Sequence, residues 1–200
     1  MSRIHYIFIC ALCCLFSSVA LAKGERYGAA VNYRQVDSID YTQGDSGEFD
    51  TMSFGLVHTR PIDENNNRMR WWLGFNYLNG ETDTPAGGVY QKVTSYELRV
   101  VPQFAIANWG KFTPLLGLGL SAAYSEYKNR WYVDNSGYKY GSKLENINQF
   151  EAGIVVSVGA AVKLGSDPEA CFQLVPQLSY VKPVYNDGLG GLEFTIALLF

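Results

Sequence analysis

The sequence has few of the residues that build disulfide frameworks and metal sites. It contains four cysteines and two histidines in 200 residues. Three of the cysteines and His5 lie within the first 14 residues, so Cys171 and His58 are the only such residues in the rest of the chain. A lone cysteine forms no intramolecular disulfide and no cysteine-based metal site. We therefore expect neither a metal nor a cofactor.

An excess of basic residues is also absent. The chain has 16 Lys and Arg against 19 Asp and Glu, a formal charge of -3. Without its first 22 residues, whose only charged residue is Arg3, the balance is 15 against 19, which gives 15 − 19 = −4. Nucleic-acid binding requires a basic surface, so this charge speaks against a nucleic-acid partner.

Long apolar runs are missing beyond residue 22, although 48% of the residues are hydrophobic. No stretch there approaches the ~20 apolar residues that a transmembrane helix needs, and none keeps a helical periodicity. The 20 glycines and 14 tyrosines favour many strands that are separated by turns and end in aromatic residues.

The N-terminus has the order of a secretory signal peptide. Arg3 precedes an apolar run over 6–16, and Ala-Leu-Ala at 20–22 provides an A-x-A cleavage motif. We therefore expect a signal peptide over 1–22 and one exported domain over 23–200. A retained membrane anchor is disfavoured, because the apolar run is shorter than the ~20 residues of a spanning helix.

Eight segments of the exported chain alternate apolar and polar residues. Alternate residues of a strand point to opposite faces, and most of these segments reach the ~9–11 residues that a tilted transmembrane strand needs. Pro176 interrupts the seventh segment, where the loss of a ladder hydrogen bond predicts a bulge. The expected strands are 27–35, 51–59, 68–78, 90–103, 114–125, 150–163, 172–180 and 190–200.

The last segment carries the most distinctive pattern. Phe194, Ile196, Leu198 and Phe200 alternate along it, and the chain ends on the aromatic. A strand that faces hydrocarbon needs such an apolar stripe. The alternative is a core strand of a soluble β-sandwich, because periodicity does not identify what covers the apolar face.

Long connections alternate with short turns along the chain, as in outer-membrane barrels, whose external loops exceed their periplasmic turns. The chain resembles the small barrels of the OmpA transmembrane domain and OmpX/Ail type in strand count, loop asymmetry, terminal Phe and signal peptide. The resemblance implies an eight-stranded antiparallel up-and-down transmembrane β-barrel in the outer membrane. It also implies lipid and lipopolysaccharide as surroundings, and a terminal stripe that the barrel-assembly machinery reads.

Charged residues opposite the apolar stripes are expected to point into the barrel, because Arg or Lys facing lipid at the midplane costs about 2–4 kcal/mol. Eight strands leave an interior that side chains just fill, so we expect ion pairs there and no wide pore. Arg34 should approach Glu193, since the first and last strands must pair to close the barrel. The expected interior network is Arg34, Arg70, Glu97, Arg99, Glu151 and Glu193.

Catalytic motifs are hard to find. A serine nucleophile needs a base such as histidine, and the only candidate stands in His58-Thr59-Arg60, which departs from the His-x-Ser of barrel deacylases. We therefore expect no catalytic residues. A lipid A-modifying enzyme and a narrow channel for small solutes stay open as alternatives.

The connection 126–148 is the candidate binding region. It is rich in aromatics and basic residues, and aromatics and Arg are enriched at contact surfaces. The candidates are Tyr127, Lys128, Arg130, Trp131, Tyr132, Tyr138 and Tyr140. One hypothesis is a surface for a host molecule or the anionic sugars of lipopolysaccharide. The other is that these residues extend the hairpin and pack on one another. The sequence thus predicts a non-enzymatic barrel that acts in surface binding or adhesion, or as a structural envelope component.

Overall fold

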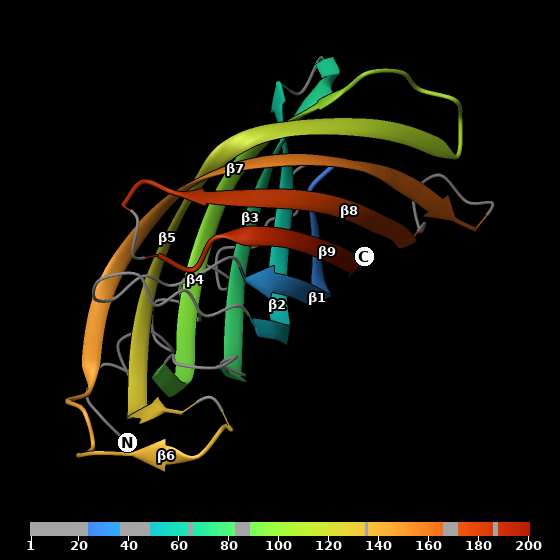
Figure 1. Cartoon of the computed structure of the whole chain (residues 1–200). Helices are drawn as coiled ribbons and strands as arrows, with labels where there is room; N and C mark the ends of the chain where they lie inside the picture. Colours follow the sequence, from blue (N-terminus) through green and yellow to red (C-terminus); the bar gives the residue numbers. More distant parts are fainter. Residues whose placement is uncertain are drawn as a thin grey trace.

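A single antiparallel sheet that closes on itself makes up the described part of the chain (Figure 1). The computed structural model describes residues 24–36, 49–63, 66–82, 89–134, 136–165, 172–185 and 188–200. The expected signal peptide, most of the first long connection and Cys171 lie outside these residues. Among the described residues, no helix is long and apolar enough to cross a membrane.

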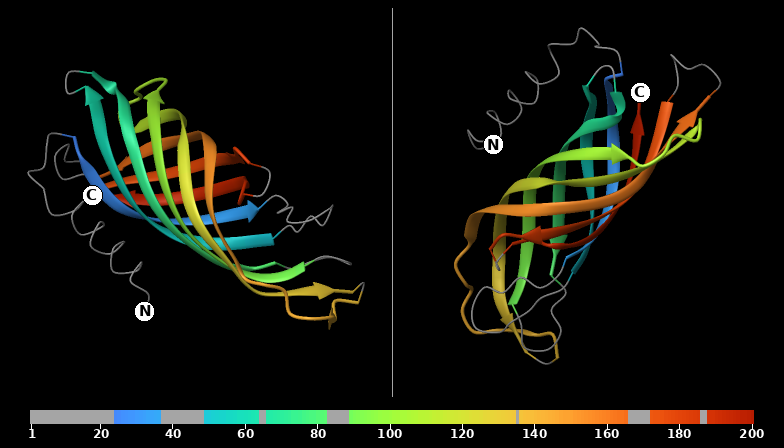
Figure 2. Two further views of the ribbon diagram at one scale, coloured as in Figure 1. Left: turned by 90° about the vertical axis from the view of Figure 1, so that its left-hand side faces the viewer. Right: turned by 90° about the horizontal axis from the view of Figure 1, so that it is seen from above.

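Each strand pairs with its neighbour in sequence, and the first pairs with the last. The strands are β1 (Arg26–Val36), β2 (Phe49–Asp63), β3 (Asn66–Glu81), β4 (Val89–Ala105), β5 (Phe112–Val133), β6 (Lys139–Tyr140), β7 (Ile147–Leu164), β8 (Phe172–Pro183) and β9 (Gly191–Leu199). The sheet order is β4-β3-β2-β1-β9-β8-β7-β5-β6, and a further β4–β5 pairing closes the ring. Because β6 only adds two residues to β5, the barrel has eight strands. The predicted fold is confirmed, and Figure 2 shows the strands winding round a common axis.

The barrel has two distinct ends. At one end, which we call the turn end, lie the short β2–β3 and β4–β5 connections, the start of β1 and the C-terminal Phe200. At the other, the loop end, β5 continues into the β6 hairpin, far from the C-terminus in Figure 1. The backbone amides of Tyr27 and Phe200 each donate to the other residue's carbonyl, at 3.1 and 2.8 Å, which fastens the two termini of the barrel together.

The outer face is apolar and the inner face is largely polar. Along β9, Phe194, Ile196 and Leu198 point outward, whereas Glu193 and Thr195 are buried inside. The same alternation exposes large apolar side chains on the outside of every long strand. This is the reverse of a soluble sandwich, so that alternative is excluded: a continuous exposed belt of this kind needs an apolar environment.

The long strands continue past their predicted ends at the loop end. β5 runs to Val133, and its ladder with β7 extends to the pair Tyr127–Ile147. Of the two hypotheses for 126–148, the extension of the hairpin is the one that the strands follow: much of this connection is a strand extension that rises beyond the apolar belt, and it is not one long loop. Outward residues on β5 are apolar up to Tyr124 and then change to Glu126 and Lys128.

The bulge expected at Pro176 is also absent. β8 pairs with β9 through Pro176 and Ile196 in an unbroken register, and the β7–β8 register is the same on both sides of a short unpaired gap. Gly159 explains this, because a Cβ built there would lie 2.7 Å from the carbonyl oxygen of Pro176. Because Gly159 has no side chain, β7 approaches Pro176 closely. The β7–β8 ladder therefore loses a few pairings near the proline, but neither strand gains an extra residue. Register shifts occur instead at 61–63 and 90–92.

Candidate functional site

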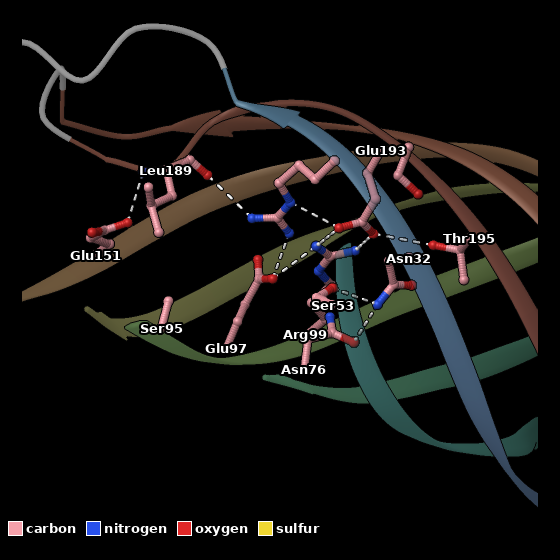
Figure 3. Close-up of polar contacts among 12 residues, drawn as sticks. Asn32, Ser53, Asn76, Ser95, Glu97, Arg99, Glu151, Leu189, Glu193 and Thr195 are labelled. Atoms are coloured by element: carbon pink, nitrogen blue, oxygen red, sulfur yellow. Dashed lines mark hydrogen bonds and ion pairs between the residues drawn. The ribbon is translucent and has the colours of Figure 1, made fainter. Parts of the chain in front are cut away.

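Two arginines and two glutamates form a closed ring of ion pairs in the barrel interior (Figure 3). Arg34 on β1 places its Nε 2.8 Å from Glu193 Oε2 and its Nη2 2.6 Å from Glu97 Oε2. Arg99 on β4 donates from Nη2 to Glu97 Oε2 and Glu193 Oε2, both at 2.8 Å, and from Nη1 to Glu193 Oε1. The four side chains are all buried. Their charges sum to zero, so the ring stabilises each member without a net charge in the lumen.

The strand register explains how these four residues meet. Arg34 and Glu193 lie directly opposite each other where β1 pairs with β9, as expected from counting inward from the strand ends. Glu97 and Arg99 are two residues apart on β4, so both point to the inner face. They reach Glu193 and Arg34 across the lumen rather than along the sheet.

Neutral polar groups extend this ring. Thr195 Oγ1 donates to Glu193 Oε1 at 3.1 Å, and Arg34 Nη1 donates to the carbonyl of Leu189 at 3.4 Å. Beside the ring, Asn32 Nδ2 donates to Ser53 Oγ at 2.9 Å. The interior is therefore joined across strands by hydrogen bonds as well as by charge.

The other two members of the expected network lie elsewhere. Arg70 Nε donates to Gln103 Oε1 at 2.8 Å near the turn end. Glu151 accepts hydrogen bonds from Tyr127 Oη at 2.6 Å and from the amide of Leu189 at 2.8 Å, towards the loop end. Within the described residues neither makes an ion pair. The six residues therefore do not form a single network. Alternation along a strand determines which face of the sheet a side chain lies on, but not its depth along the barrel axis.

Two of the seven candidate binding residues point inward instead of lying on a loop. Tyr127 is fully buried and bonds Glu151. Arg130 is buried as well, with Nε donating to Gln91 Oε1 at 3.1 Å and Nη1 to the carbonyl of Glu145 at 3.0 Å. Asn129, with φ 54°, breaks the alternation just before Arg130 and turns this even-numbered side chain inward. The expected exposure of these two residues is corrected accordingly.

The other five candidates lie on the outside of the extension. Tyr132 pairs across the hairpin with Tyr140, and their rings stack with centroids 6.0 Å apart. Tyr138 is 73% exposed, Lys128 is exposed, and Trp131 is half-buried. These aromatics therefore pack partly on one another and partly present their faces to solvent.

Further charged residues belong to this surface, and sequence reasoning missed those on β3 and β4, Glu81 and Lys92. Lys139 Nζ lies 3.6 Å from the ring centroid of Tyr90, a cation–π contact. Lys92 pairs with Glu81 at 2.5 Å where β3 and β4 face each other. The hydrogen bonds from Lys92 and Tyr90 hold the pKa of the Glu81 carboxyl below its usual value, and the bond to Glu81 raises the pKa of Lys92. The Glu81–Lys92 pair follows from the β3–β4 register, which no single-strand pattern contains.

The candidate catalytic base lies on the outer face at the turn end. His58 stacks on Tyr27 with ring centroids 4.5 Å apart and planes 8° from parallel. Its neighbour Thr59 is buried on the opposite face. In the part of the chain that the structure describes, no group of three or more His, Cys, Asp or Glu side chains is arranged to hold a metal ion.

The closed ring of eight antiparallel strands, the outward apolar belt and the inward polar side chains define the fold of a small outer-membrane β-barrel. No protein-family model matches the chain, and no curated protein matches it either. Among solved structures, Neisserial surface protein A is similar with a TM-score of 0.57 at 13% identity, covering 88% of this chain and 96% of that one.

Two further outer-membrane proteins are similar at lower scores. Ail, the attachment invasion locus protein of Yersinia pestis, has a TM-score of 0.46 at 14% identity, covering 87% of this chain and 95% of that one. The N-terminal β-barrel domain of OprF from Pseudomonas aeruginosa has a TM-score of 0.43 at 9% identity, covering 88% and 97%. Identities this low concern the fold alone.

Proposed function

We propose that the protein is a non-enzymatic barrel of the outer membrane that binds anionic sugars through its strand extension. The binding surface, which we call the outer ridge, lies at the loop end. It consists of Tyr90, Lys92, Lys128, Trp131, Tyr132, Tyr138, Lys139 and Tyr140.

The observation that carries this proposal is that the ridge, apart from Tyr138 in the turn before β6, stands on paired strands rather than on a loop. β5 has 22 residues, about twice the ~9–11 that cross a bilayer. Its apolar outer face gives way to charged residues at Glu126, which places the later residues beyond the hydrocarbon. A surface held by a β-ladder loses little conformational freedom on binding, which favours affinity.

The chemistry of the ridge suits anionic sugars. Aromatic faces such as those of Tyr132 and Tyr140 offer flat apolar surface for sugar rings, and the ammonium groups of Lys92, Lys128 and Lys139 offer donors for phosphate or carboxylate. Lipopolysaccharide carries both features, and it surrounds such a barrel in the outer leaflet. Adhesion to a host glycan of similar charge is the second use of the same surface.

The interior favours this role over a channel. The ring of Arg34, Glu97, Arg99 and Glu193 crosses the lumen. The cavity beside it, lined in part by Arg34, Glu97 and Glu151, has a volume of about 10 Å³, which is close to the space of one water molecule.

Binding of purified protein in phosphatidylcholine nanodiscs to immobilised lipopolysaccharide tests the proposal. We expect Tyr132→Ala combined with Tyr140→Ala, and separately Lys139→Gln, to weaken binding several-fold. Matched controls lie at the turn end: Trp109→Ala removes an aromatic that is 69% exposed, and Lys111→Gln removes an exposed charge. Equal losses in ridge and control variants would contradict the proposal.

The enzymatic alternative is tested by incubating the same protein with lipopolysaccharide and measuring the mass of lipid A by mass spectrometry. We expect lipid A of unchanged mass. A shift by one acyl chain that is lost in His58→Ala would replace the binding function with lipid A modification.

A further inference from the structure

A second candidate site lies inside the barrel at the turn end. A cavity of about 650 Å³ occupies the lumen there, bounded by the ends of β2, β3 and β7 and by the β4–β5 connection at Ile106 and Asn108. Its volume falls within the roughly 300–1,000 Å³ of small-molecule sites. None of the four ring residues that centre on Glu193 lines it, so it is a separate site from the ion-pair ring, and it does not involve the outer ridge.

The lining of this cavity is strongly basic. Among the described residues that line it there are five basic side chains and no Asp or Glu. Arg60 pairs with Glu25 at 3.3 Å and holds much of its side chain in solvent, so it contributes least to the cavity. We call the other four, which come from three different strands, the basic vestibule. They are Arg26, Arg68, Arg70 and Lys163.

Arg70 has one guanidinium nitrogen that is left over to bind an anion. Its Nε donates to Gln103 Oε1 at 2.8 Å, and its guanidinium carbon lies 5.9 Å from the ring centroid of Trp72. Its Nη2 is buried and has no hydrogen-bond partner among the described residues. Arg26 lies close enough to repel its charge. A buried charged donor without a partner is costly, and an oxyanion in the cavity would remove both that cost and the repulsion.

We propose that the basic vestibule binds a phosphate-bearing anion that enters from the turn end, with Arg70 as the direct ligand. A guanidinium presents parallel donors that match the oxygens of a phosphate. Several cations around one volume favour a multiply charged anion over chloride or a single carboxylate. Gln103 and Trp72 hold the guanidinium in place, and Lys163 on β7 supplies a second charge from across the cavity.

Calorimetric titration of the exported chain in an uncharged detergent with inorganic pyrophosphate tests the site. We expect saturable binding at one site per barrel, and a higher unfolding midpoint in pyrophosphate than in sodium chloride of equal ionic strength. Arg70→Gln should weaken binding at least ten-fold and Lys163→Gln several-fold. Lys111→Gln, an exposed charge at the same end outside the cavity, should leave binding unchanged.

Two results overturn the proposal: pyrophosphate binding no stronger than that of chloride, or equal affinities in Lys163→Gln, Arg70→Gln and Lys111→Gln. If Arg70→Gln does not fold, Lys163→Gln decides, because it leaves the Arg70–Gln103 bond intact. Nanodiscs identify the source of the phosphate. A weaker apparent pyrophosphate affinity with phosphatidylglycerol than with phosphatidylcholine assigns the site to lipid headgroups, and equal affinities assign it to a soluble anion.

Discussion

The ion-pair ring permits a sharp test through Glu193. This carboxylate accepts from Arg34 at 2.8 Å, from both terminal nitrogens of Arg99 and from Thr195 at 3.1 Å, and it is fully buried. Glu193→Gln removes one negative charge, so the ring changes from neutral to a net charge of +1. Both arginines are then left to share Glu97.

The expected magnitude follows from burial. Removing one partner of a buried ion pair typically costs ~3–5 kcal/mol. At a urea dependence of about 2 kcal/mol per M, the unfolding midpoint should fall by about 1.5–2.5 M. Adding Arg34→Gln restores neutrality, because Arg99 and Glu97 remain as a pair at 2.8 Å. The double variant should therefore lose less than the sum of the two single losses, by about 0.5–3 kcal/mol.

Reversible urea unfolding in lipid vesicles, followed by tryptophan fluorescence, measures all four members of this cycle. The exposed pair Glu81–Lys92 provides the control, since its side chains are about half exposed and solvent screens such pairs. Glu81→Gln should leave the midpoint nearly unchanged. Strictly additive losses for Arg34→Gln and Glu193→Gln would refute the coupling argument, whatever the size of the single losses.

Three further outcomes are expected. The exported chain should fractionate with outer membranes and migrate differently on gels before and after heating, and recovery as a soluble periplasmic protein would end the barrel interpretation. Phe200→Asp should lower outer-membrane levels, because it places a charge on the outer face beside the backbone bonds to Tyr27, and unchanged levels under native expression would count against a terminal assembly signal. The Glu81 carboxyl should stay ionised below the ordinary glutamate pKa of ~4.3, because its folded-state pKa is lowered. The Glu81–Lys92 ion pair is therefore fully present above the ordinary pKa and is lost as the pH falls through the lowered pKa. Carboxyl NMR titration checks this, and a normal or raised pKa would contradict the contact.

The sequence predicted the faces of the strands well and the depth of side chains poorly. Parity alone placed Arg34, Glu97 and Glu193 inside, because a period of two is fixed by strand geometry. Contact between Arg34 and Glu193 was predictable because barrel closure forces β1 against β9. The contacts of Arg99 with Glu193 cross the lumen between residues 94 apart in sequence, and no local pattern encodes them.

The errors at the loop end and on β8 have local causes. Arg130 was a candidate because it lies in a connection rich in aromatic and basic residues, but Asn129, with φ 54°, leaves the extended conformation and turns the Arg130 side chain inward. Pro176 was expected to force a bulge, but the residue that accommodates it, Gly159, stands on another strand and 17 positions earlier in sequence. In both cases the outcome depends on how neighbouring strands are aligned, and the residue pattern of one strand does not contain this information.

The charged side chains differ between the middle, the turn end and the loop end of the barrel, and each region suits a different function. The ring around Glu193 is neutral, so it holds the lumen together without attracting ions. The basic vestibule at the turn end has no described acidic side chain in its lining, whereas Lys92 and Lys128 on the outer ridge each have an acidic partner. A lining with a net positive charge attracts soluble anions at long range, and paired charge among aromatics instead selects ligands by close contact. Salt should therefore weaken pyrophosphate binding at the vestibule more steeply than lipopolysaccharide binding at the ridge.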